Sequence, residues 1–116
     1  MVFYVDDDLL VDVLGVEVTE TTTGGRRLAV PSHDGTQELE LWLDPEAGWI
    51  GIRLREAGET SVHLDREGVT HLRIEWREKE AWVHAQIEAP GMVGTLQVVV
   101  GRRVRMIDEL SRVALP

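Results

Sequence analysis

The central part of the chain alternates between apolar and polar residues with a period of two. From Gln37 to Glu88 this alternation runs through five segments that are separated by short polar turns. A period of two places every second side chain on the same face of a β-strand. The apolar side chains that share one face are Leu39, Leu41, Leu43, Ile50, Ile52, Leu54, Val62, Leu64, Leu72, Ile74, Val83, Ala85 and Ile87. The pattern predicts a five-strand antiparallel meander that buries this face.

Turn residues indicate where each strand reverses. Gly58 and Gly68 each stand near the end of a polar stretch, at the position of a three-residue hairpin loop that needs a positive φ. The segment Asp44–Gly48 indicates a longer loop, and Glu78-Lys79 is the expected tip of another hairpin. These turns set the register of the five strands.

In this register the polar face carries complementary cross-strand partners. The expected pairs are Glu38 with Arg55, Glu40 with Arg53, Trp42 with Gly51, His63 with His71, and Trp82 with Val99. His84 is expected one row from the two paired histidines, beside Arg73.

The flanking segments extend the sheet. Asp7 to Leu14 is expected to form a short helix that ends at Gly15. A hairpin around Gly24-Gly25 precedes the meander, and Thr95 to Val100 and a short strand from Val104 follow it. Ile107 to Ala114 is expected to form a terminal helix, because Ile107 and Leu110 have helical spacing.

The predicted fold is therefore mainly β: a bent antiparallel meander of seven or more strands with a short helix at each end. Whether the sheet closes into a barrel stays open. At 116 residues the chain is expected to form one domain, residues 1–116.

The charge of −9 lies entirely in the first half of the chain. Residues 1–50 contain 11 acidic and 2 basic side chains, a balance of −9, and the remaining residues balance to zero. Net charge commonly serves solubility, and an acidic surface also steers a protein toward a basic partner. Nucleic-acid binding is disfavoured, because affinity for phosphates comes from Lys and Arg.

The chain contains no cysteine, which excludes disulfides and thiolate zinc sites. The first residues lack the basic and apolar regions of a signal peptide, and no apolar run reaches membrane-spanning length. We expect a cytoplasmic protein that binds no membrane.

Three histidines are a candidate metal site. If His63 and His71 face each other, their Cβ atoms lie about 5 Å apart, and His84 on the diagonal would supply a third ligand. The alternative is a set of solvated histidines on an exposed sheet face.

Two further motifs have simpler interpretations. Ser32-His33-Asp34 contains the residue types of a hydrolytic triad, but consecutive residues cannot converge as a triad does, and Gly35 favours a turn. Gly101–Arg105 is basic and indicates a polar hairpin turn.

The tryptophans are a candidate binding surface. The chain has four tryptophans but only one Phe and one Tyr. The predicted surface consists of Trp42, Trp49, Trp82, Val99, Arg53 and Arg73. Tryptophan and arginine are enriched at interface hot spots; cover by the expected C-terminal helix is the structural alternative, and stacking of sugars on the indoles is a third.

The function that these features favour is a small acidic binding protein without catalytic activity or cofactor. Its partner would be another protein or a second copy, and one form is an immunity-like protein that neutralises a basic toxin. The alternative is a ligand- or metal-binding β-barrel, with enzymatic activity left open, that uses the face with His63, His71 and His84.

Overall fold

The structure, a computed structural model, describes residues 3–22 and 24–112. Within these residues one helix precedes nine strands. They are α1 (Asp7–Leu14), β1 (Thr19–Glu20), β2 (Arg26–Pro31), β3 (Gln37–Asp44), β4 (Trp49–Glu56), β5 (Glu59–Arg66), β6 (Val69–Arg77), β7 (Glu80–Ala89), β8 (Met92–Val100) and β9 (Val104–Arg112).

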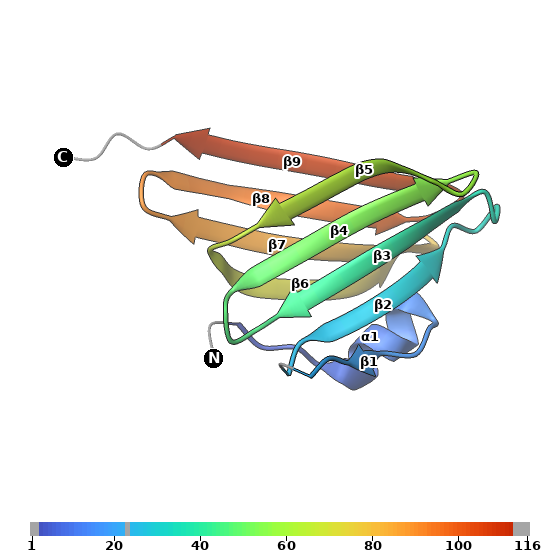
Figure 1. Cartoon of the computed structure of the whole chain (residues 1–116), viewed down its shortest axis with the longest axis horizontal. Helices are drawn as coiled ribbons and strands as arrows, with labels where there is room; N and C mark the ends of the chain where they lie inside the picture. The colour runs from blue at the N-terminus through green and yellow to red at the C-terminus, as the bar shows by residue number, and fades with distance from the viewer. Residues whose placement is uncertain (1–2, 23, 113–116) are drawn as a thin grey trace.

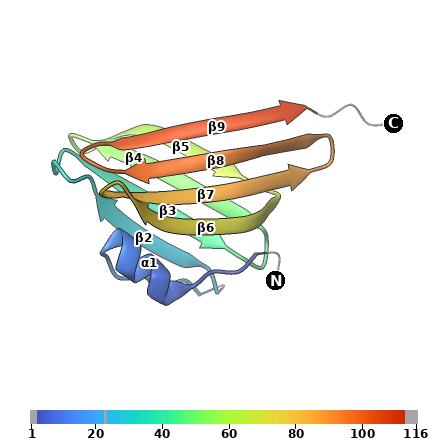
Figure 2. The ribbon, with the colours of Figure 1, turned by 180° about the vertical axis from the view of Figure 1, so that it is seen from behind.

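The strands form two antiparallel sheets with the orders β1-β2-β3-β4-β5 and β6-β7-β8-β9. The sheets lie as two layers, and the chain passes from one layer to the other between β5 and β6 (Figure 1, Figure 2). Apolar side chains of both sheets form one buried cluster. The mainly β, antiparallel fold is confirmed, and the sheets do not close into a barrel.

The predicted register between β3 and β4 is confirmed. The cross-strand pairs are Glu38 with Arg55, Leu39 with Leu54, Glu40 with Arg53, Leu41 with Ile52, Trp42 with Gly51, and Leu43 with Ile50. The leucines and isoleucines of these pairs are buried.

The β4–β5 hairpin is tighter than predicted. Ala57 and Gly58 form a two-residue turn, with φ of 53° and 79°, so Gly58 adopts the expected positive φ in a shorter loop. A bulge follows, and Leu54 pairs with Val62, whereas the predicted three-residue loop would place Thr60 opposite Leu54. The hydroxyl of Ser61 at this bulge donates a hydrogen bond to the carbonyl of Leu54 at 3.2 Å. The faces of β5 are unchanged because the shift is even.

The predicted pairing of β5 with β6 is wrong, because these strands are edge strands of different sheets. Gly68 has the expected positive φ of 80°, but it marks a corner between the layers. Its carbonyl accepts a hydrogen bond from the amide of Glu88 at 2.8 Å, and the amide of Val69 donates to the carbonyl of Gly48 at 2.9 Å. The corner is thereby anchored to both sheets.

The second sheet follows the predicted register over most of its length. The pairs are Leu72 with Ala85, Ile74 with Val83, Trp76 with Ala81, Ala85 with Leu96, Val83 with Val98, and Trp82 with Val99.

The predicted C-terminal helix is wrong. Residues Ile107 to Arg112 belong to β9, which pairs with β8 along its whole length, and Ala114 lies outside the described residues. Asp108 interrupts the apolar alternation of this strand, and Arg66 of β5 forms an ion pair with it. Because the partner comes from the other sheet, the local pattern does not reveal this strand.

The N-terminal helix is confirmed. The Asp6 side chain accepts a hydrogen bond from the amide of Leu9 at 3.1 Å, and Gly15 ends the helix with φ of 71°. Leu10 and Leu14 are buried, and α1 packs beside β6. The hairpin before the meander is also present, although β1 has only two residues.

Candidate protein-binding surfaces

The structure separates the three histidines of the predicted metal site. His63 lies on β5 and pairs with Arg53, whereas His71 and His84 lie on β6 and β7 of the other sheet. In the part of the chain that the structure describes, no group of three or more His, Cys, Asp or Glu side chains is placed to hold a metal ion. Burial, followed by the charge of Arg73, lowers the pKa of His84. The predicted metal site required His63 and His71 to be cross-strand neighbours, and the structure does not place them so.

The six residues of the predicted binding surface fall on two different sheets. Trp42, Trp49 and Arg53 belong to β3 and β4, and Arg73, Trp82 and Val99 belong to β6, β7 and β8. Each set alternates with core residues of its own sheet, so each lies on an outer face, and the two faces point in opposite directions. These residues do not form one continuous surface.

On the outer face of the first sheet, two arginines flank Trp42. The guanidinium carbons of Arg27 and Arg53 lie 5.8 and 5.5 Å from the centroid of its ring. The indole of Trp49, rather than that of Trp42, covers Gly51: a Cβ built at Gly51 would lie 2.6 Å from that ring. Glycine is therefore required at Gly51 for the ring of Trp49 to lie against the backbone.

Glu40 is the buried acid of the same face. Its side chain is 5% exposed and lies 3.2 Å from Arg27 and 3.7 Å from Arg55, each of which is 44% exposed. The structure thus fixes two cations around one buried carboxylate, beside the ring of Trp42.

On the outer face of the second sheet, arginines also cover Trp82. The guanidinium carbon of Arg77 lies 4.0 Å from the ring centroid and that of Arg105 lies 5.9 Å from it. Val99 beside it is fully buried. The indole N–H of Trp82 is buried without a hydrogen-bond partner among the described residues. Arginine side chains of the same sheet, and not a C-terminal helix, provide the cover.

Ser32, His33 and Asp34 form a turn and not a triad. The hydroxyl of Ser32 donates a hydrogen bond to Asp34 at 2.8 Å, and the ring of His33 lies 6.2 Å from that of Trp76. The amide and hydroxyl of Thr36 also donate to Asp34, at 2.9 and 2.7 Å. These three bonds, with Thr36 contributing most, lower the pKa of Asp34 to about 2.

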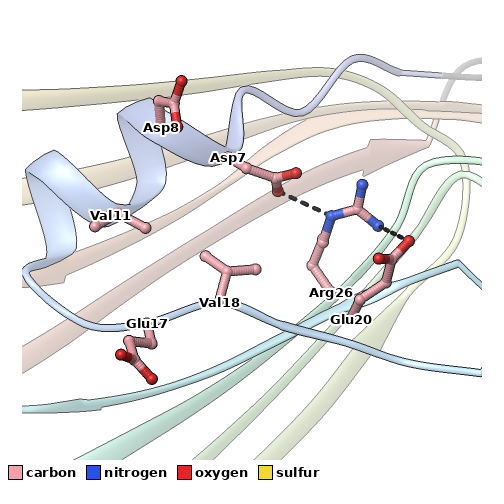
Figure 3. Close-up of a pocket in the computed structure, with 7 residues that line it drawn as sticks. All are labelled: Asp7, Asp8, Val11, Glu17, Val18, Glu20 and Arg26. Carbon is pink, nitrogen blue, oxygen red and sulfur yellow. Dashed lines mark hydrogen bonds and ion pairs between the residues drawn. The ribbon is translucent and has the colours of Figure 1, made fainter.

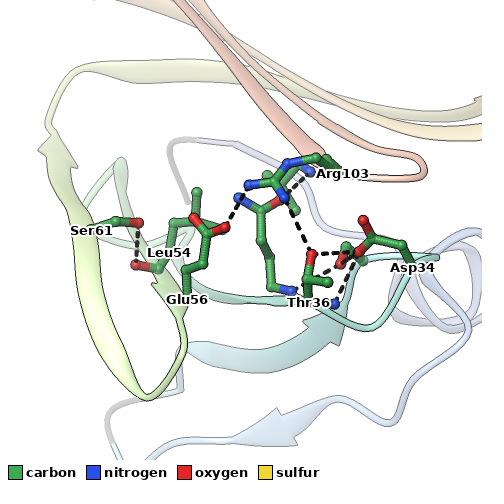
Figure 4. A network of polar contacts seen from close by, with 9 residues as sticks. Asp34, Thr36, Leu54, Glu56, Ser61 and Arg103 are labelled. Atoms are coloured by element: carbon green, nitrogen blue, oxygen red, sulfur yellow. Dashed lines mark hydrogen bonds and ion pairs between the residues drawn. The ribbon is translucent and has the colours of Figure 1, made fainter.

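This turn is joined to the β8–β9 turn by a polar network (Figure 4). Arg103 donates hydrogen bonds to Glu56 at 2.6 Å and to Thr36 at 3.4 Å, and the side chain of Gln37 accepts one from the amide of Val104 at 2.8 Å. The bond from Arg103 lowers the pKa of Glu56. The network holds the loops at this end of the sandwich together, and the basic segment is confirmed as a turn.

Trp76 is a surface residue that the sequence interpretation missed. It pairs with Ala81 as predicted, but it is 56% exposed, because it stands in the last part of β6, beside the hairpin tip. It borders a hollow of about 430 Å³ that His33, Pro31 and Val16 also line. The sequence signal for this exposure is that Trp76 lies close to the predicted hairpin tip at Glu78-Lys79.

The acidic first half of the chain surrounds a second hollow, of about 350 Å³, between α1 and β1 (Figure 3). We name its lining the acidic face; it consists of Asp7, Asp8, Val11, Glu17, Val18, Glu20 and Arg26. Four carboxylates thus meet one guanidinium, a local balance of −3.

Arg26 neutralises only part of the acidic face. It lies 2.8 Å from Asp7 and 3.6 Å from Glu20, and the hydrogen bond to Asp7 is the main cause that raises its pKa. Asp8 and Glu17 point away from it (Figure 3). Neither forms an ion pair with a described residue. The face therefore presents unpaired negative charge together with Val11, which is 41% exposed.

Comparison with known proteins identifies the fold. No family model and no curated protein matches the sequence. One chain of a solved contact-dependent growth inhibition toxin–immunity protein complex from Klebsiella pneumoniae 342 is similar in structure, with a TM-score of 0.80 and 12% sequence identity. The match covers 92% of this chain and 95% of that chain. Among the residues described, no helix is long and apolar enough to span a membrane.

Proposed function

We propose that this chain is an immunity-type protein that binds a protein toxin and blocks it, and that the acidic face is its binding surface. The single observation that carries the proposal is the similarity in fold, over nearly the whole chain, to one member of a toxin–immunity protein complex.

The charge of the chain supports the immunity role over the toxin role. A toxin that acts on an anionic substrate needs cations in its site, and a protein that blocks such a site needs the opposite charge. This chain carries a net charge of −9, and all of it comes from residues 1–50.

The acidic face supports the location because it combines unpaired charge with exposed apolar area. Asp8 and Glu17 are exposed carboxylates, and Val11 of α1 is 41% exposed. Charges of one sign accelerate association with a basic partner, and apolar contacts at the centre of an interface slow dissociation.

Binding to the proteins encoded by the neighbouring genes tests this proposal. The wild-type chain should bind one of them in calorimetry, and the association rate should fall as salt is added. The variant Asp8→Lys/Glu17→Lys should bind at least about tenfold more weakly, which corresponds to about 1.4 kcal/mol.

A matched control separates local charge from total charge. The variant Glu59→Lys/Glu67→Lys has the same net charge as the acidic-face variant, −5 in place of −9. It changes two exposed residues, one on β5, the opposite edge strand of the first sheet from β1, and one directly after β5. It should bind like the wild type. Equal weakening by both variants would contradict the acidic face as the binding surface, and toxicity of this chain when it is expressed alone would contradict the immunity role.

A further inference from the structure

β9 is a long edge strand, and apart from the inward-pointing Asp108 its backbone is regular. It has nine residues, pairs with β8 without a bulge, and contains no Pro and no Lys. An edge strand presents a row of free backbone N–H and C=O groups, and proteins usually shorten, bend or cover such edges. Among the described residues no element lies beyond β9 in either view (Figure 1, Figure 2).

The other three sheet edges are protected. β1 has only two residues, β5 carries the bulge near Leu54, and α1 packs beside β6. β9 is thus the one long regular edge of the described residues that is open to pairing.

The outer face of β9 is complementary to itself. Arg105, Ile107 and Glu109 follow one another on this face, with the hydrophobic residue midway between opposite charges. If two copies of β9 pair in antiparallel fashion about a two-fold axis at Ile107, Arg105 of each copy lies opposite Glu109 of the other. We propose that the protein forms a symmetric dimer in this register.

Other symmetric registers are less favourable. An axis at Asp108 would place two aspartates opposite each other, and an axis at Glu109 would do the same with two glutamates, which is destabilising. An axis at Met106 leaves fewer residues of the strand paired. The axis at Ile107 pairs Val104 to Leu110 and opposes no like charges.

The side chains of the strand are available for this pairing. Ile107 is 39% exposed, so contact with its own copy removes apolar area from water. Arg105 binds Glu80 only through Nη2, and its Nε and Nη1 make no hydrogen bond to a described residue. Asp108 points to the inner side and is already neutralised by Arg66, so it does not oppose a second copy.

The dimer would leave the acidic face free. α1 packs beside β6, which is the opposite edge of the sheet from β9. A dimer through β9 would therefore carry two acidic faces at its far ends. The inference does not depend on the proposed function, and the isolated protein is sufficient to test it.

Sedimentation equilibrium over a range from about 10 µM to about 1 mM tests the dimer, because an interface formed by one pair of strands is small and transient. The wild type should show a concentration-dependent dimer that weakens as salt is added. The variants Glu109→Arg and Arg105→Glu each oppose like charges twice, so each should weaken the dimer by at least about tenfold.

The double variant Arg105→Glu/Glu109→Arg restores opposite charges in this register and should dimerise within about threefold of the wild type. Glu88→Arg, a charge reversal at an exposed position of β7, is the control and should change nothing. Since Arg105 also contacts Glu80, thermal melts check that each variant is folded, and Ile107→Lys gives a second disruption at an exposed site. A wild type that stays monomeric to about 1 mM, or a folded double variant that is as weak as the single ones, would overturn the dimer.

Discussion

Substitution of Glu40 gives the sharpest test of the structure through the free energy of unfolding. The sequence places Glu40 on the polar face opposite Arg53, but its side chain is only 5% exposed. Glu40→Ala removes a charge-assisted hydrogen bond from Arg27 at 3.2 Å and a second ion contact, with Arg55, at 3.7 Å. It also removes a buried methylene.

A hydrogen bond to a charged group contributes about 1.5–3 kcal/mol, and we take the lower end because both arginines are 44% exposed and regain water. With the buried methylene, Glu40→Ala should lower the free energy of unfolding by about 2 kcal/mol. At this chain length that corresponds to a fall in Tm of roughly 8 °C.

Glu38→Ala is the matched control, because Glu38 lies on the same face of β3 but is exposed. It should cost about 1 kcal/mol or less. Urea titrations followed by tryptophan fluorescence measure both values, and Glu40→Gln, which keeps the volume, should fall between them. If the two alanine variants differ by less than about 0.5 kcal/mol, the buried carboxylate does not stabilise the face as argued.

Three further predictions concern the core, the Asp34 turn and Trp82. Ile52→Ala should cost about 2–5 kcal/mol because Ile52 is fully buried, and Leu72→Ala should cost less because Leu72 is half-buried, as denaturant midpoints will show. The folded pKa of Asp34 is about 2, below the ordinary 3.8, so its contribution to stability is present above the ordinary value and is lost as the pH falls through about 2. Melting temperatures of Asp34→Asn should therefore depend less on pH across this acidic range than those of the wild type. Trp82→Ala should leave the fold intact and weaken self-association, since Trp82 supports Arg105; unchanged sedimentation would remove Trp82 from the association surface.

The β3–β4 pairing could be predicted because two independent signals agree there. The alternation predicts which side chains face the core and which face solvent. The opposite charges of Glu38 and Arg55 favour the register in which these two residues are paired. The second sheet was predictable for the same reason, with large and small side chains opposed, as at Trp76 and Ala81.

The passage from β5 to β6 could not be predicted from alternation. A strand that crosses to the other layer buries the same side chains as one that turns back, and Gly68 has a positive φ in either case. The difference lies in long-range contacts, such as the bond between Gly68 and Glu88. The predicted histidine site depended on this pairing and was lost with it.

The C-terminal strand could not be predicted because one residue interrupts its alternating pattern. Asp108 on the inner side breaks the alternation and leaves Ile107 and Leu110 in a helical spacing. Its partner in the ion pair, Arg66, stands 42 residues earlier in the chain. A partner at that distance leaves no local trace in the sequence.

Growth of a bacterial host that expresses, one at a time, the proteins encoded by the genes beside this one tests the central claim most directly. Co-expression of the wild type or of Glu59→Lys/Glu67→Lys should restore growth, and co-expression of a folded Asp8→Lys/Glu17→Lys variant should not. Failure of the wild type to protect against any neighbouring gene product, or full protection by the acidic-face variant, would contradict the account.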